Sequence, residues 1–159
     1  MTINLAAQGN QSPKDAQGKK HGEWRKVYDN KKLRYIGTFE HGIPVDTFKY
    51  YFPFGDLQAI NVFRGKTGNS YSYQYGEGKQ LAAEGLYIDK KKDSTWTIYN
   101  ADGMVIGREN YENGIKEGPS ISYYANGKVA EKLFYINGKK EGEWQQFYES
   151  GEPMAKGIY

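Results

Sequence analysis

The two histidines, His21 and His41, are the side chains best suited to acid–base catalysis or metal binding near neutral pH. The chain contains no cysteine, so it offers no disulfide, thiolate ligand or thiol nucleophile. Paired carboxylates such as Glu141 and Glu143 flank a turn glycine, a position that does not prepare them for acid–base work. The segment Gly76-Glu77-Gly78-Lys79 looks like a phosphate loop but lacks the helix whose N-terminus would bind the anion.

A repeat of 24 residues determines how these residues are interpreted. It is marked by six aromatic residues, Phe39, Phe63, Tyr87, Tyr111, Tyr135 and Tyr159. A second framework position, 15 residues earlier, holds Trp24, Trp96 and Trp144 in three of the repeats. Such a period is typical of stacked supersecondary units. Both histidines fall on turn positions where other repeats carry ordinary polar residues. We therefore predict no catalytic residue, no metal ligand, no cofactor and no enzyme activity.

Each repeat has the pattern of a β-hairpin. In the sixth repeat, Trp144, Gln146 and Tyr148 share one face of a strand by their spacing of two. Hairpin turns are indicated by Asn113-Gly114, Asn126-Gly127, Asn137-Gly138 and Asp102-Gly103. No segment between these turns has room for a helix of about 10 residues. The sequence predicts an all-β fold, an elongated single-sheet antiparallel meander of about six hairpin repeats over residues 18–159. Residues 1–17 lack the period and are predicted to be a flexible lead-in.

The third repeat is expected to be irregular. Its framework aromatic and glycine lie one residue early, at Tyr71 instead of Ser72 and at Gly78 instead of Lys79. The next framework residue, Leu81, is back in phase, so a bulge or a longer turn is predicted between Gly78 and Leu81.

Composition limits the partners and leaves the compartment open. The net charge of +3 is too small to predict nucleic-acid binding. The mean hydropathy of −0.85 and the lack of a long apolar run argue against a membrane span. The N-terminal stretch has no basic n-region, so it is not an intact signal peptide. Leu5-Ala6-Ala7-Gln8 is compatible with the end of a trimmed signal peptide, and both a cytoplasmic and an exported location stay open.

The repeat resembles a known family. The pattern G-x-x-x-G-x-W-x-x-x-Y-x-x-G, followed by a short strand ending in Tyr, is similar to the MORN repeat and to its bacterial variant in YwqK-type antitoxins. It is carried by GKKHGEWRKVYDNKKLRYIGTF, ENGIKEGPSISYYANGKVAEKLFY and NGKKEGEWQQFYESGEPMAKGIY. Repeats two to four depart from it; Asp46 replaces the second glycine in the second repeat, and the third repeat lacks the Trp. The resemblance implies stacked hairpins that serve as scaffolding, membrane-associated or toxin-neutralising modules.

Two surfaces are candidates for binding. The first lies on the second strand of each hairpin, on the face opposite the framework aromatics. Its side chains change from apolar in the first three repeats to basic in the last three, and the repeat pattern does not require this change. This candidate partner surface consists of Ile36, Ile60, Val62, Leu86, Arg108, Lys132 and Lys156. The second is a candidate basic edge of paired turn lysines, Lys19, Lys20, Lys91, Lys92, Lys139 and Lys140, although acidic residues follow each pair.

The leading hypothesis from the sequence is a non-enzymatic scaffold that binds another protein, with a toxin-neutralising module as the more specific form of this hypothesis. The alternative is a peripheral membrane or cell-envelope module that binds anionic lipid through the basic edge. No nucleic-acid partner is expected. We also expect a monomer, because Pro153 removes a hydrogen-bond donor from the last strand and Lys156 adds charge to it.

Overall fold

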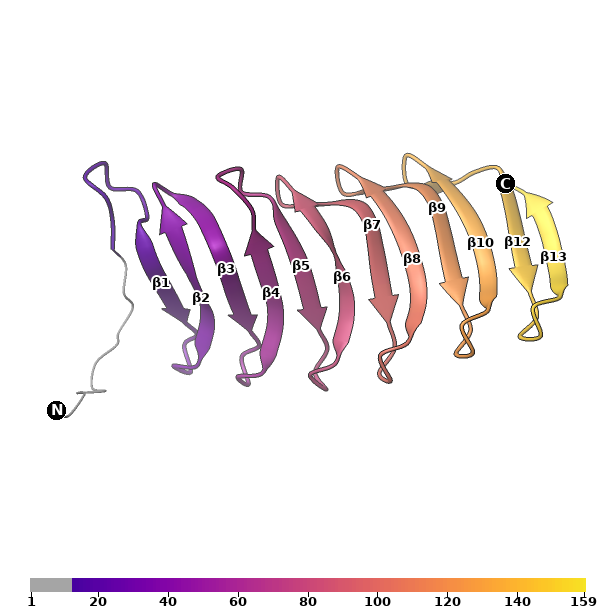
Figure 1. The fold of residues 1–159 in the computed structure, drawn as a ribbon, viewed down its shortest axis with the longest axis horizontal. Helices are drawn as coiled ribbons and strands as arrows, with labels where there is room; N and C mark the ends of the chain where they lie inside the picture. The colour runs from indigo at the N-terminus through magenta and orange to yellow at the C-terminus, as the bar shows by residue number, and fades with distance from the viewer. Residues whose placement is uncertain (1–12) are drawn as a thin grey trace. The chain divides into compact units, whose positions relative to one another are not determined.

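The computed structural model describes residues 13–159, so most of the predicted lead-in, including Leu5 to Gln8, lies outside the described residues. These residues divide into two compact units, residues 13–68 (unit 1) and residues 69–159 (unit 2). The strands of unit 1 are β1 (Gly22–Val27), β2 (Leu33–Glu40), β3 (Ile43–Tyr51) and β4 (Leu57–Phe63) (Figure 1). Unit 2 contains β5 (Ser70–Tyr75), β6 (Leu81–Ile88), β7 (Lys91–Tyr99), β8 (Val105–Glu112), β9 (Ile115–Tyr123), β10 (Val129–Ile136), β11 (Lys139–Lys140), β12 (Glu143–Phe147) and β13 (Pro153–Ile158).

In each unit, consecutive strands pair antiparallel in chain order, with only the two-residue β11 off this path. This confirms the predicted all-β meander of hairpins. Residues 13–159 contain no helix, and so none that is long and apolar enough to cross a membrane. The tryptophans occupy matching places in their hairpins, as predicted: Trp24 pairs with Gly37, Trp96 with Glu109 and Trp144 with Gly157.

The turns that close the six hairpins share one geometry. In the first hairpin, Tyr28 N–H donates to Lys32 O and Lys31 N–H donates back to Tyr28 O, at 2.8 and 2.9 Å. The same two bonds recur in the other five turns, with first residues Phe52, Gly76, Asn100, Tyr124 and Tyr148. The fourth turn residue has positive φ and is usually glycine, which adopts this conformation without a steric penalty.

The prediction of an irregular third repeat is wrong. Its turn makes the same two hydrogen bonds, and Lys79 occupies the positive-φ position at 65° while Gly78 does not. Ser72 keeps the framework position opposite Gly85, and Tyr71 lies on the other face of β5. The hydrogen-bonded turn therefore fixes the register, and Lys79 adopts the left-handed conformation in place of glycine, as Lys31 does in the first repeat.

Replacing Lys79 with glycine should stabilise unit 2 by about 0.5–1 kcal/mol, because a side chain in the left-handed region costs roughly 1–2 kcal/mol, partly offset by the backbone entropy of glycine. The matched reverse change, Gly103→Lys in the next turn, should lose a similar amount. Urea unfolding of both variants measures the difference. A loss of stability in Lys79→Gly would contradict the assigned register.

The core consists of aromatic rings that lie over glycines of the preceding strand. Trp96 is 0% exposed and covers Gly85, and Phe48 is 2% exposed and covers Gly37. These close approaches need glycine, because any Cβ on Gly37 or Gly85 would overlap the ring. Gly37 and Gly85 thus leave space for rings from the adjacent strands.

Side chains in one turn also bind the backbone of the next turn. In unit 1, Tyr28 Oη donates to Tyr51 O at 2.7 Å and Asn30 Nδ2 donates to Pro53 O at 2.8 Å. In unit 2, Tyr124 donates to Phe147 O at 2.7 Å and Asn126 donates to Glu149 O at 3.0 Å, one repeat after another. These bonds hold successive hairpin turns in line along one edge of each unit.

Candidate functional site

Three cations form a row across unit 2, on the sheet face opposite the tryptophans. Arg108 on β8 and Lys132 on β10 both pair with Ile121 of β9. Lys132 and Lys156 on β13 both pair with Gln145 of β12. Residues paired in this way point to the same face, so neighbouring cations lie two strands apart, at about 9–10 Å. Arg108, Lys132 and Lys156, here called the basic row, are all exposed.

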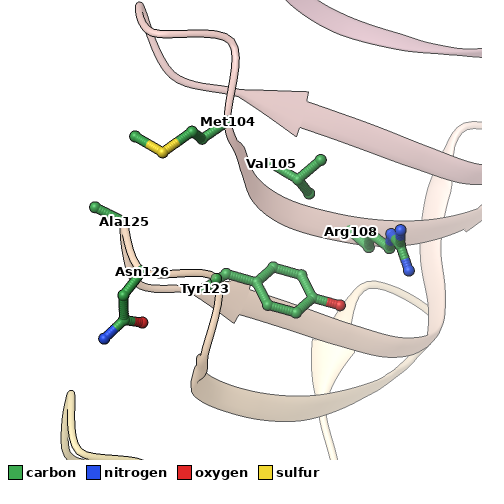
Figure 2. A pocket seen from close by; sticks show the side chains of 7 residues that line it. Met104, Val105, Arg108, Tyr123, Ala125 and Asn126 are labelled. Atoms are coloured by element: carbon green, nitrogen blue, oxygen red, sulfur yellow. The ribbon is translucent and has the colours of Figure 1, made fainter.

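Each of the first two cations lies beside an aromatic ring from the next hairpin. Figure 2 shows Arg108 and Tyr123 on the wall of a pocket of about 420 Å³, with the hydroxyl end of Tyr123 directed toward the side where Arg108 lies. The Nζ of Lys132 lies 5.5 Å from the ring centre of Phe147, within the range of a cation–π contact. Phe147 and Lys156 line a further pocket of about 370 Å³. Unit 2 thus repeats a cation next to an aromatic ring and an open apolar hollow.

Sequence reasoning missed Glu84, which precedes Arg108 at the same repeat position. Glu84 pairs with Thr97, and Thr97 pairs with Arg108, so this carboxylate begins the row. Tyr99 Oη donates to Glu84 Oε1 at 2.6 Å, and this hydrogen bond is the main reason that the pKa of Tyr99 rises to about 12. The 24-residue spacing alone would have placed Glu84 at this repeat position. In unit 2 this position is therefore acidic on β6 and basic on β8, β10 and β13.

The apolar members of the candidate partner surface are less accessible. Ile36, Ile60 and Val62 are half-buried in unit 1, where Ile36 and Ile60 both pair with Lys49. Leu86 is half-buried in unit 2. Leu86 lies two residues after Glu84 on β6 and pairs with Tyr71 of β5, so it is not part of the basic row.

Half of the candidate basic edge is engaged with aromatic rings. The second lysine of each predicted pair lies over framework aromatics: Lys20 Nζ is 4.5 Å from the Trp24 ring, and Lys92 Nζ is 4.2 Å from the Trp96 ring. Burial lowers the pKa of Lys92. Lys140 Nζ lies 5.1 Å from the Tyr159 ring and donates to its hydroxyl at 3.1 Å. Lys20 and Lys92 are half-buried over the aromatic core, while Lys140 and the first lysines of the pairs, Lys19, Lys91 and Lys139, are exposed.

The same repeat position holds Lys116, which the sequence reading did not include because its neighbour is Ile115. Lys116 Nζ lies 5.1 Å from the Tyr135 ring and 2.6 Å from Glu109 Oε1. Glu109 also accepts a hydrogen bond from Tyr111 at 2.6 Å. Burial opposes the charge on Glu109, but the hydrogen bonds from Lys116 and Tyr111 prevail and lower its pKa.

The two histidines come together at one end of unit 1. The ring centres of His21 and His41 are 5.0 Å apart, and His41 Nδ1 donates to Asp15 Oδ2 at 2.7 Å. One ligand atom from each of Asp15, His21 and His41 lies within 4.8 Å of the other two. Sequence reasoning treated the histidines as separate turn residues and missed Asp15, because Asp15 precedes the first repeat and has no periodic counterpart.

Comparison with known proteins identifies part of the repeat. Residues 20–41, 116–137 and 140–159 match the family model described as MORN repeat variant. The chain is therefore a β-hairpin repeat protein in which three segments match the MORN repeat variant model, and such repeats are generally motifs that bind proteins or membranes. No curated protein matches the chain.

Two solved structures similar to this chain are of TarM. One is a mutant of S. aureus TarM in complex with Fondaparinux, alpha-GlcNAc-glycerol and UDP, at 19% identity and a TM-score of 0.47. The match covers 68% of this chain and 21% of that one. The second is a crystal structure of TarM, also at 19% identity and a TM-score of 0.47, with 67% of this chain and 20% of that one covered. The chain spans about a fifth of the length of these proteins.

Proposed function

We propose that this protein is a non-enzymatic repeat scaffold that binds another protein through the basic row of unit 2. The observation that carries the proposal is the row itself: Arg108, Lys132 and Lys156 are exposed and aligned on the face that the core does not use. A surface with three cations in line is complementary to an acidic partner surface.

The apolar residues near the row indicate that the partner is a folded protein surface rather than a simple polyanion. Phe134 follows Lys132 by two residues on β10, and Met154 and Ile158 flank Lys156 by two residues on β13, so they share its face. Phe134 is 42% exposed and Ile158 is 78% exposed. Exposed aromatic and aliphatic side chains next to cations are typical of protein interfaces.

The alternative, an anionic membrane surface bound through the basic edge, has less support. Lys20 and Lys92 already lie half-buried over aromatic rings, so Lys140 and the first lysine of each pair are the ones available to lipid headgroups. The toxin-neutralising role implied by the YwqK-type resemblance is a narrower form of the proposal, in which the acidic partner is a toxin.

The test compares two triple variants with the same change of charge. The row variant is R108E/K132E/K156E, and the control is K19E/K91E/K139E on the exposed lysines of the basic edge. A partner captured from the source cell is purified, and its affinity for each variant is measured by calorimetry. We expect the row variant to bind at least about 100-fold more weakly, roughly 1 kcal/mol for each cation lost, and the control to bind within about threefold of the original chain.

Two results obtained with these variants would overturn the proposal. One is equal weakening in the row variant and the control, because a general loss of positive charge would then explain the binding. The other is flotation of the original chain with anionic vesicles that is lost in the control and kept in the row variant, since that result assigns binding to lipid at the basic edge. Recovery of no stoichiometric partner would also contradict it.

A further inference from the structure

Asp15, His21 and His41 come from three separate segments of unit 1. Asp15 lies in the turn of residues 13–20 that precedes β1, His21 lies directly before β1, and His41 lies in the turn between β2 and β3. These are the two histidines of the whole chain, and the fold places their ring centres 5.0 Å apart beside one carboxylate. Two imidazoles and a carboxylate are a common ligand set for a divalent zinc ion.

The Asp15 carboxylate is already oriented for a ligand. Its Oδ1 accepts hydrogen bonds from the backbone N–H groups of Gln17 and Lys19, both at 2.9 Å. The side chain is 7% exposed, and its second oxygen, Oδ2, is directed at His41. Hydrogen bonds of this kind hold a metal-binding carboxylate in place before the ion arrives.

Comparison among the repeats shows that His21 makes the longest example of a recurring turn hydrogen bond. In unit 2 a polar side chain accepts from the backbone N–H of a turn residue 20 positions later: Asn69 from Asp89 at 3.3 Å, Asp93 from Asn113 at 3.3 Å and Glu117 from Asn137 at 2.7 Å. In unit 1, His21 Nδ1 meets His41 N at 3.5 Å, the longest of the four contacts. Only at this turn are the side-chain acceptor and the turn residue both histidine. Because Asn, Asp and Glu make the same hydrogen bond at shorter distances, the hydrogen bond does not explain why histidine occupies both positions.

We propose that Asp15, His21 and His41 bind one divalent first-row transition-metal ion, with Zn²⁺ as the ion that the ligand set favours. The three protein ligands leave a fourth tetrahedral position for water. The ligand atoms lie within 4.8 Å of one another and must move closer together to reach bonding distances of about 2.0–2.2 Å from a common centre. Imidazole nitrogen also suits Ni²⁺ and Cu²⁺, whereas Mg²⁺ and Ca²⁺ prefer oxygen ligands and are not expected to compete.

Bound metal fastens the turn of residues 13–20 to the first hairpin. That turn already contacts β1, because Trp24 Nε1 donates to Pro13 O at 2.8 Å. Within the turn, the backbones of Lys14 and Lys20 form an isolated antiparallel β-bridge. The nearby carboxylate of Glu40 is held by Lys66 at 2.8 Å and is not needed as a ligand. The ion thus cross-links the three segments that carry Asp15, His21 and His41, which are otherwise connected by hydrogen bonds.

The test uses the full chain without a histidine tag, freed of metal with a chelator and titrated with Zn²⁺ in a calorimeter. We expect one Zn²⁺ per chain, retained through dialysis and counted by elemental analysis. The double variant H21N/H41N should lose at least 100-fold in affinity, and it should fold, because asparagine occupies these positions at Asn69, Asn113 and Asn137. D15N should bind about 10- to 100-fold more weakly.

The control adds a histidine pair at the equivalent turn of unit 2, where no residue corresponds to Asp15. In the H21N/H41N background, D93H/N113H should restore much less Zn²⁺ affinity than the original site has. Equal affinity of the original chain and H21N/H41N would overturn the proposal. So would tight binding by D93H/N113H that matches the original chain, since any pair of turn histidines would then suffice. Displacement of Zn²⁺ by millimolar Mg²⁺ would contradict the assigned ligand class.

Discussion

Replacing Trp96 with alanine should destabilise unit 2 by about 3–5 kcal/mol, the largest effect expected from a single change in this chain. The ring is 0% exposed, packs edge-on against Tyr87 at 5.0 Å and donates to Leu86 O at 3.1 Å. Alanine removes these contacts and leaves a cavity over Gly85. The position of the urea unfolding transition, followed by circular dichroism, measures the loss.

Trp144→Ala is the matched control for this change. Trp144 has the same repeat position in the last hairpin and covers Gly157, but its ring is half-buried. Its loss should cost about half as much as that of Trp96, since less apolar surface returns to water. Equal costs for the two variants would show that burial does not govern the contribution of this framework position.

Gly85→Ala should destabilise unit 2 by about 1–3 kcal/mol, although alanine usually stabilises a strand relative to glycine. A Cβ at Gly85 would lie 2.5 Å from Cδ2 of Trp96, a distance at which the ring or the backbone must move. Because that ring is fully buried, it has no free space to move into. Chemical denaturation compared with the original chain gives the cost.

Gly107→Ala provides the control in the same unit. Its Cβ would have Ile98 Cδ1 as its nearest neighbour, at an ordinary contact distance of 3.5 Å. Ala59, Ala83 and Ala155 occupy this repeat position elsewhere, so we expect a change within about 0.5 kcal/mol or a small gain. If both glycine variants had the same stability, ring-on-glycine packing would not explain why Gly85 is required.

Much of the fold could be predicted from the sequence, because the repeat fixes which residues face each other. The spacing of Trp24, Trp96 and Trp144 placed each of them correctly in its hairpin. Gly37 and Gly85, over which rings pack, are small residues at one fixed place in the repeat. Both signals reflect sterics between adjacent strands, which recur whenever the same side chains do.

The third repeat could not be predicted in this way, since Tyr71 and Gly78 suggested a shift that the backbone does not make. Residue preference favours glycine at a positive-φ position by only about 1–2 kcal/mol. The two hydrogen bonds of the turn and the pairing of Ser72 with Gly85 are enough to hold Lys79 there. Backbone register thus prevailed over the local preference of single residues.

The candidate sites were predicted unevenly. Arg108, Lys132 and Lys156 could be grouped from the sequence because they share a repeat position, whereas the pattern of paired lysines did not distinguish Lys91 from Lys92. The difference between these two lysines is the direction of the side chain, which places one Nζ over Trp96. Asp15 could not be found from the repeat at all, since only the folded turn brings it to His41.

The chain-order pairing of the strands has a consequence for synthesis on the ribosome. Within each unit, paired residues lie less than one 24-residue repeat apart, and each hairpin packs on the one made before it. The preceding hairpin is therefore already folded when the next hairpin emerges, and the new hairpin needs no contact with residues distant in the sequence. In such an arrangement folding keeps pace with translation, and apolar strands are exposed for only as long as the next repeat takes to appear.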